Sequence, residues 1–292
     1  MSMAGYVMMT DSCCDLSAEM AAELELEVLP LRLELEGRSF QNYLDGREIG
    51  FREFYEKVRN GAMPVTSAVN VGEFETAMRS ALESGRDVLC LCFSSALSTT
   101  YQSAVIAAGE LREEFPERKI LVVDTLCASM GQGLLVWLCV QEKRKGRTIE
   151  EVRDYAERTK ANICHWFTVD DLNHLKRGGR VSATAALFGT MLSIKPVLHV
   201  DSQGRLIPME KFRGRRASLL ALADHMKKTA AAPGEYPVFI SHGDCREDAE
   251  FVAEEVRRRL GVREVYIHYV GPVIGSHTGA GVMTLFFVGR ER

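Results

Sequence analysis

The chain has 292 residues, and its 36 basic and 40 acidic side chains give a formal net charge of −4. A content of 46% hydrophobic and 26% charged residues is close to the globular average, which excludes a disordered, a collagen-like or a coiled-coil chain. The slight acidity argues against nucleic acid as the main partner, because binding to phosphates requires a basic surface.

The sequence contains no pattern typical of a membrane-spanning or exported protein. Its longest apolar run, at 134–140, is much shorter than the roughly 18 residues of a transmembrane helix, so we expect no stable membrane insertion. No basic stretch precedes a long apolar one near residue 1, and we expect no signal peptide. The eight cysteines are scattered without a C-x-x-C pair, which favours free thiols in a reducing, cytoplasmic compartment.

The first half of the chain predicts alternating strands and helices. An apolar run at 6–10 predicts a strand, and Ser17 begins the helix predicted after it. Alternating leucines at 29–35, followed by a turn at Glu36-Gly37, predict one arm of a hairpin. Further helices are predicted at 51–58, 70–82, 98–114, 130–145 and from 148 onward, and buried strands at 87–93 and 120–123. This rhythm predicts a parallel sheet flanked by helices, in which ligands bind beyond the carboxyl ends of the strands.

The second half predicts a mixed α+β arrangement. A strand at 165–169 precedes a basic, glycine-broken loop at 176–180 and an apolar stretch at 183–198. The remaining predicted elements are a hairpin at 197–209, helices at 217–228 and 248–260, and strands at 238–240, 265–270 and 282–288.

The predicted fold class is therefore α/β with two domains. We expect an N-terminal α/β domain at 1–160, with a parallel sheet and a hairpin insertion at about 28–48. The C-terminal domain, at 161–292, is expected to be α+β with a mixed sheet.

Motifs for nucleotides, metals and activated serines are absent from the sequence. There is no GxxxxGK[ST], GxGxxG, HExxH or GxSxG, so we expect neither a cofactor nor a metal. The segment His242-Gly243-Asp244-Cys245 is interpreted as a strand-to-helix turn with Asp244 as the helix cap and no chemical role.

Three polar segments are predicted to be loops that approach a ligand. They are Thr66-Ser67, the serine-rich segment 94–104, and the glycine-rich segment 271–281, which contains His277. Serines between a strand end and a helix start can bind an anion through free N–H groups. The alternative is that Ser94, Ser98 and Thr99 only cap the helix. Four glycines around His277 indicate a segment whose backbone approaches a ligand closely.

These segments and four others resemble the motifs of the DegV family of fatty-acid-binding proteins (FakB-type, EDD fold). The seven resembling segments are Asp11-Ser12, Thr66-Ser67, 94–104, 123–129, 178–182, 194–196 and 277–281. The sequence departs from the family pattern at Ala68-Val69-Asn70, at Thr99, which stands in place of Gly, and at Ala280, which stands in place of Pro.

The resemblance implies a lipid site at the domain junction, with the carboxylate held by Thr66, Ser95 and His277. Two hydroxyls and an imidazole can donate hydrogen bonds to a carboxylate without carrying a permanent positive charge. A permanently charged side chain would compete with phosphoryl transfer to the carboxylate. Residues expected near the head group are Ser67, Ser94, Ser98, Thr278 and Gly279.

The resemblance also implies that the C-terminal domain encloses the fatty acid tail, each buried CH2 of which contributes about 0.8 kcal/mol. Candidate tail-lining residues are Leu187, Phe188, Met191, Leu192 and Ile194, with ordinary core packing as the alternative for each. Candidate residues for docking to a kinase subunit are Arg180, Arg177 and Lys176, then Lys211, Arg213, Arg215 and Arg216, with a solvated turn as the alternative for 176–180.

The function implied is that of a cytoplasmic, non-enzymatic carrier in phospholipid metabolism. It would bind a long-chain fatty acid and present the carboxylate to a separate ATP-dependent fatty acid kinase subunit. One alternative is a hydrolase or acyl transferase with Ser95 as nucleophile, His277 as base, and Asp11 or Asp124 as the orienting acid. Another is a module that binds a different lipid or small acid without a kinase.

Overall fold

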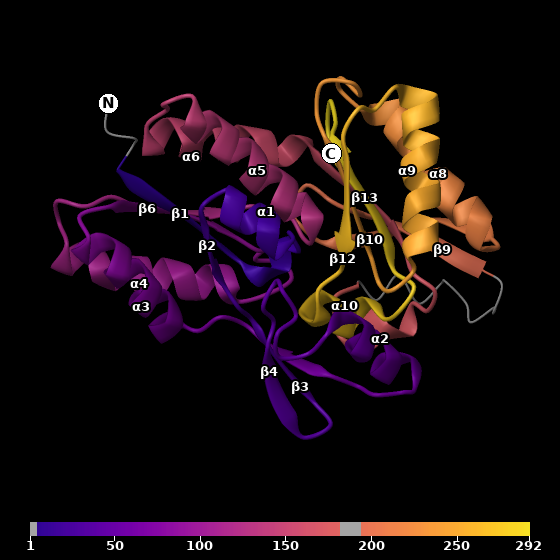
Figure 1. The fold of residues 1–292 in the computed structure, drawn as a ribbon, viewed down its shortest axis with the longest axis horizontal. Coiled ribbons are helices and arrows are strands. Elements are labelled where there is room, and N and C mark those ends of the chain that lie inside the picture. Colours follow the sequence, from indigo (N-terminus) through magenta and orange to yellow (C-terminus); the bar gives the residue numbers. More distant parts are fainter. Residues whose placement is uncertain (1–4, 182–193) are drawn as a thin grey trace.

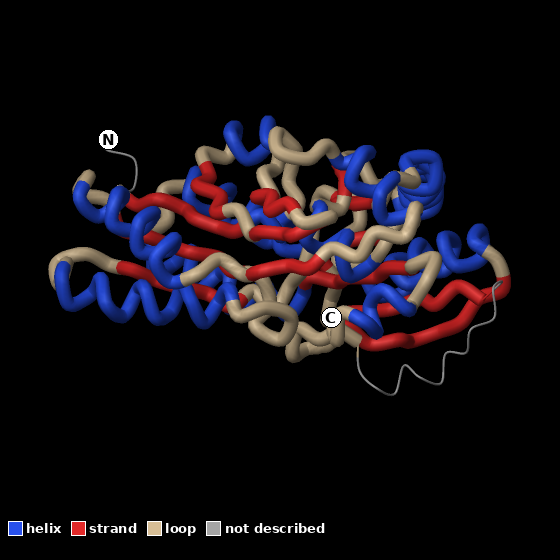
Figure 2. Tube along the Cα trace, turned by 90° about the horizontal axis from the view of Figure 1, so that it is seen from below, coloured by secondary structure: helices blue, strands red, loops and turns tan. Residues whose placement is uncertain are grey.

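The computed structural model describes residues 5–181 and 194–292, which three sheets organise (Figure 1). A four-stranded sheet has the order β2-β1-β6-β7, a six-stranded sheet the order β10-β9-β8-β13-β11-β12, and a small sheet the order β4-β3-β5. The tube view shows helices on both sides of the strands (Figure 2).

The four-stranded sheet is parallel throughout and is buried on both faces. On β1, Val7 and Met9 pack toward α3 and α4, whereas Met8 packs toward α5 and α6. The continuous apolar strands predicted at 87–93 and 120–123 are therefore confirmed as strands of a parallel sheet, with β6 inside the sheet and β7 at its edge. Its strands and helices are β1 (Tyr6–Asp11), β2 (Leu26–Leu29), β6 (Asp87–Cys92), β7 (Ile120–Asp124), α1 (Ala18–Glu23), α3 (Val71–Glu83), α4 (Thr100–Glu114), α5 (Met130–Arg144) and α6 (Ile149–Thr159).

The six-stranded sheet is mixed, with β11 and β12 as its parallel pair. One face packs under α8 and α9, while alternate residues of β8 and β13, such as Phe167 and Phe286, face the other way. Its elements are β8 (Ile163–Thr168), β9 (Ile194–Val200), β10 (Leu206–Arg213), β11 (Val238–His242), β12 (Val265–Tyr269), β13 (Met283–Val288), α8 (Arg215–Thr229) and α9 (Arg246–Leu260).

The small antiparallel sheet and three short helices lie where the larger sheets meet (Figure 1). The helix α10 packs against α2 and α7 and approaches β3 and β5. These elements are β3 (Arg32–Leu35), β4 (Arg38–Gln41), β5 (Val65–Ser67), α2 (Phe51–Arg59), α7 (Asn173–Arg177) and α10 (Pro272–Thr278); two 3-10 turns, η1 (Ser12–Cys14) and η2 (Lys160–Asn162), complete the described elements.

Three capping patterns in the sequence place helix starts correctly. Ser17 accepts a hydrogen bond from Met20 N at 3.1 Å and begins α1. Asn70 forms a reciprocal capping box with Glu73, and Thr148 forms one at the start of α6. The boundary expected at 160 stays a prediction, although the four-stranded sheet ends before it and the six-stranded sheet begins after it.

Four local predictions are wrong. The segment 271–281 is expected to be a loop, but residues within it form α10, whose glycines interrupt the helical pattern of apolar residues. The segment 66–67 is also expected to be a loop, but it belongs to the three-residue strand β5. Lys176 and Arg177 end the helix α7 rather than lying in a loop. Cys245, not Asp244, precedes α9 as its cap, because Asp244 has a left-handed backbone and pairs with Arg59.

The capping box of α3 provides a test of the local energetics. We expect Asn70→Ala to lower the free energy of unfolding by about 1 kcal/mol, because the N–H of Glu73 loses its acceptor. Asn60→Ala is the control, since this exposed asparagine follows α2 as its C-cap and makes no side-chain hydrogen bond within residues 5–181 and 194–292. Its effect should stay within about 0.5 kcal/mol. Urea unfolding measures both, and equal effects would contradict the capping role.

Candidate functional site

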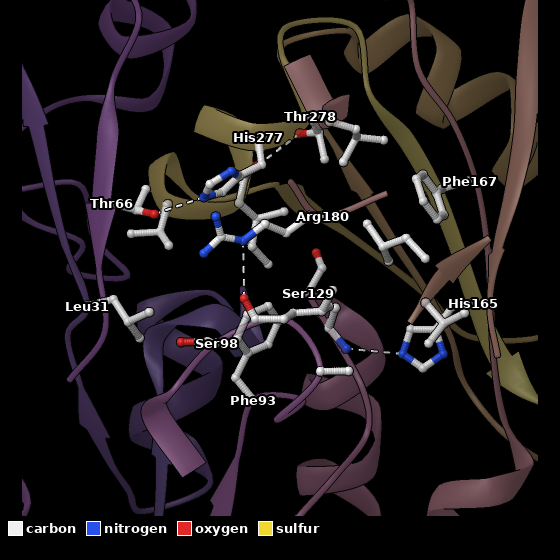
Figure 3. A pocket seen from close by; sticks show the side chains of 18 of the residues that line it. Leu31, Thr66, Phe93, Ser98, Ser129, His165, Phe167, Arg180, His277 and Thr278 are labelled. Carbon is white, nitrogen blue, oxygen red and sulfur yellow. Dashed lines mark hydrogen bonds between the residues drawn. The ribbon is translucent and has the colours of Figure 1, made fainter. Parts of the chain in front are cut away.

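A cavity of about 490 Å³ lies where the two larger sheets meet (Figure 3). Its walls come from β5, from the segments that follow β6 and β7, from one face of β8 and β13, and from α10. The carboxyl ends of β6 and β7 therefore lead to the cavity, as expected for a parallel sheet.

Thr66 and His277 meet at one end of this cavity (Figure 3). The Oγ1 atom of Thr66, on β5, lies 2.8 Å from Nε2 of His277, in the last turn of α10. Ser95 lines the same cavity, and its backbone N–H donates to Oδ1 of Asp124 at 3.1 Å. The three side chains expected at the head group thus line one cavity, although Thr66 and His277 are 211 residues apart in the sequence.

His277 is a neutral imidazole at pH 7. Burial and then the nearby positive charge of Arg180 lower its pKa to about 4. A Cβ atom at position 178 would overlap Nδ1 of His277, so only glycine fits there against the ring. The imidazole therefore offers one N–H donor, and its Nε2 faces Thr66.

Arg180 corrects the expectation of a head-group site without permanent positive charge. Its side chain lines the cavity between His277 and Leu97 (Figure 3), where Nε donates to the carbonyl of Leu97 at 3.3 Å and Nη1 to that of Gly178 at 2.5 Å. The sequence predicts Arg180 as a docking residue, with a solvated turn as the alternative, because no local pattern shows that Gly178 lies against His277 of α10. Lys176 and Arg177 are not among the lining residues, and Arg177 contacts His174.

The residues expected around the head group divide into two sets. Ser67, Ser98 and Thr278 line the cavity, whereas Ser94 and Gly279 do not. Ser94 is fully buried and donates to the carbonyl of Gly204 at 2.9 Å.

The capping alternative is partly right for the serine-rich segment. Ser98 accepts from Thr100 N at 3.2 Å and Ser94 from Ala96 N at 3.3 Å, so both hydroxyls order the turn before α4. Thr99 is the residue at the helix cap, but its side chain makes no capping bond.

The rest of the cavity wall is largely apolar. Among the apolar lining residues are Leu31, Phe93, Leu97, Phe167, Leu175, Val200, Leu206, Val273, Ile274, Val282 and Phe286. Sequence reasoning missed Phe167 and Phe286, although the period of two in β8 and β13 puts them on one face. The expected tail-lining residues Leu187, Phe188, Met191 and Leu192 lie outside the described residues; Ile194 begins β9, is half-buried and does not line the cavity.

The geometry gives no support to the hydrolase alternative. The imidazole of His277 has one hydrogen-bond partner among residues 5–181 and 194–292, and it is Thr66, not an acid. Asp11 accepts from the backbone N–H groups of Cys13 and Phe93, and Asp124 accepts from those of Ser95 and Leu126. Neither carboxylate orients the imidazole as a base.

No helix in residues 5–181 and 194–292 is long and apolar enough to cross a bilayer. In the described part of the chain, no group of three or more His, Cys, Asp or Glu side chains is arranged to hold a metal ion.

Comparison with known proteins gives likenesses over the whole chain. Residues 6–290 match the sequence model of the family described as "Uncharacterised protein, DegV family". A DegV domain-containing protein of Clostridium perfringens is 44% identical over 287 residues, which cover 98% of both chains.

Two solved structures show the same fold. A DegV family protein from Thermus thermophilus, described by its fatty acid binding, is 32% identical with a TM-score of 0.88, and the match covers 97% of this chain and 99% of that one. DegV of Bacillus subtilis, a fatty acid binding protein, is 27% identical with a TM-score of 0.84, covering 98% and 100%. The predicted α/β fold class, with a parallel and a mixed sheet, is confirmed.

The charge of Arg180 can be tested through the titration of His277. We expect Arg180→Gln to raise the pKa of His277 from about 4, because removal of a neighbouring cation favours the protonated imidazole. Arg177→Gln is the matched control, since Arg177 contacts His174 instead. Titration by NMR measures both variants, and an unchanged pKa of His277 in Arg180→Gln would show that its charge does not act on the imidazole.

Proposed function

Because this chain belongs to the DegV family, we propose that it binds one long-chain fatty acid in the cavity between the sheets. The carboxylate would lie against Thr66, Ser95 and His277. The observation that carries the proposal is the contact of Thr66 with His277 at one end of the cavity, which Ser95 also lines, together with apolar walls over most of the cavity. Related proteins with the same fold bind fatty acids.

The head-group chemistry follows from the donors. Thr66 and Ser95 each offer a hydroxyl, and the neutral imidazole of His277 offers one N–H. A carboxylate accepts several hydrogen bonds at once, and donors to a charged acceptor form stronger bonds than neutral pairs. The guanidinium of Arg180 adds a positive charge at the same end of the cavity.

The tail would fill the apolar part of the cavity. Its 490 Å³ is within the range of small-molecule pockets, which is about 300–1,000 Å³. Each CH2 group removed from water contributes about 0.8 kcal/mol, so a long chain binds well even after the loss of its own freedom. The chain would thus act as a carrier rather than an enzyme, with the fatty acid as ligand and no cofactor.

We further propose that a separate ATP-dependent kinase subunit phosphorylates the bound carboxylate, in the cytoplasm, as a step toward phospholipids. Basic side chains near the cavity support docking of such a partner. Lys176 and Arg177 lie on α7, directly before the segment that holds Arg180. Arg215 is less suited, because its guanidinium pairs with Asp248 and donates to the carbonyl of Gly281.

Ligand binding can be tested on the purified protein by native mass spectrometry and lipid extraction. We expect wild type to retain one long-chain fatty acid. Ser95→Ala and His277→Ala should weaken its binding by about tenfold or more, because each removes a donor to a buried carboxylate. The matched control is Ser276→Ala, which removes a half-buried hydroxyl of α10 that bonds to the carbonyl of Pro272 and does not line the cavity. Wild-type protein that neither retains nor takes up any fatty acid would refute the proposal.

Docking can be tested separately from lipid binding. We expect Arg177→Glu and Lys176→Glu to reduce ATP-dependent acyl-phosphate formation by a purified fatty acid kinase subunit about tenfold, because charge reversal slows encounter of the two proteins. Their fatty acid content should match wild type, since neither residue lines the cavity. Arg258→Glu, on the exposed side of α9, is the control. Full phosphorylation with both α7 variants would exclude this surface.

A further inference from the structure

A buried acid, Asp15, joins two walls of the cavity without lining it. It follows the short turn η1, has a left-handed backbone with φ 50°, and is 2% exposed. Its Oδ1 accepts the backbone N–H of Gly271 at 3.0 Å, and its Oδ2 accepts the hydroxyl of Ser129 at 2.5 Å.

The first of these bonds fixes the start of α10, the helix that carries His277. Gly271 is the cap residue of α10 and has no side chain with which to cap it. Pro272 follows and has no N–H. A Cβ atom on Gly271 would lie 2.7 Å from Oδ1 of Asp15, so the close approach requires glycine. Asp15, which is 256 residues away in sequence, supplies the acceptor at this end of the helix.

The second bond leads to the opposite wall of the cavity. Ser129 lines the cavity at the start of α5, with a left-handed φ of 52°. Its hydroxyl also lies 2.7 Å from that of Ser241, which lies 2.7 Å from that of Thr284. Thr284 lines the cavity from β13. One carboxyl group therefore connects α10 with the mixed sheet through a continuous chain of hydrogen bonds.

No cation offsets Asp15 among the residues that the structure describes, because none of their ion pairs includes it. Burial, helped by the negative charge of Asp11, raises its pKa to about 8, against the lowering effect of its bonds to Ser129 and Gly271. Both bonds end on segments that shape the cavity.

We propose that Asp15 is a positioning residue. It holds α10, and with it His277, in a fixed position relative to the opposite cavity wall. The inference rests on the proposed fatty acid binding, because it assigns Asp15 a part in orienting a donor to the carboxylate. Loss of the carboxyl group would let the start of α10 move and would weaken the contact of His277 with Thr66.

The test compares Asp15→Ala and Asp15→Asn with wild type and with Asn162→Ala. The control is matched because Asn162 also joins distant segments by two bonds, to the carbonyls of Gly289 and Arg290, but neither it nor these partners line the cavity. The readouts are the affinity for palmitate and the pKa of His277 by NMR.

We expect Asp15→Ala to weaken palmitate binding about tenfold. It should also raise the pKa of His277 from about 4 toward its ordinary value, because the ring becomes more hydrated. Asp15→Asn keeps an acceptor for Gly271 N–H and should restore most of both properties. Asn162→Ala should change neither.

Wild-type affinity and an unchanged His277 pKa in folded Asp15→Ala would overturn the inference, as would equal losses in Asn162→Ala. Should Asp15→Ala fail to fold, Gly271→Ala decides in its place, because its Cβ would lie 2.7 Å from Oδ1 of Asp15 and should push the two groups apart. Wild-type palmitate affinity and an unchanged His277 pKa in that variant would overturn the inference. If wild type binds no fatty acid, the proposed function fails, yet the His277 titration still tests the role of Asp15.

Discussion

The cavity exists because the carboxyl ends of a parallel sheet meet the face of a mixed sheet that lies opposite α8 and α9. Backbone groups at strand ends need partners, and here buried polar side chains supply them. The carboxylate of Asp11, at the end of β1, accepts the N–H of Phe93 at 2.7 Å, and Asp124, at the end of β7, accepts that of Ser95. These bonds set the turn that brings the Ser95 side chain to the cavity. The arrangement therefore depends on acids at strand ends rather than on the residues that would touch a ligand.

Close packing of glycine against histidine shapes both ends of this cavity. At position 178 a side chain would overlap His277, and at position 131 it would overlap His165 and Phe286. Each imidazole is thereby held in one place by backbone rather than by a charged partner. Nε2 of His165 accepts a hydrogen bond from the N–H of Ala128, and its Nδ1 donates one to the carbonyl of Ile163. Both ring nitrogens therefore have hydrogen-bond partners within the protein. The imidazole of His277, by contrast, has Thr66 as its one hydrogen-bond partner in the described chain.

Periodicity in the sequence was enough to predict the parallel sheet, because strands such as 87–93 are apolar on both faces and need no tertiary information. The helix α10 could not be predicted in the same way, since Gly271, Gly275 and Gly279 interrupt the pattern and its packing against Tyr55 and Phe54 decides its conformation. The candidate head-group residues Thr66, Ser95 and His277 were predicted from the family motifs alone. The position of Arg180 in the cavity wall could not be predicted, because only the contact of Gly178 with His277 turns that segment inward.

The mixed sheet buries one face under α8 and α9 and turns Phe167 and Phe286 toward the cavity. A fatty acid tail lying against these rings would be an exchangeable part of the hydrophobic core. A ligand that binds only the folded chain stabilises it in proportion to the logarithm of its free concentration over its Kd. The thermal stability of this protein, and hence its resistance to proteolysis, would then increase with the concentration of free fatty acid.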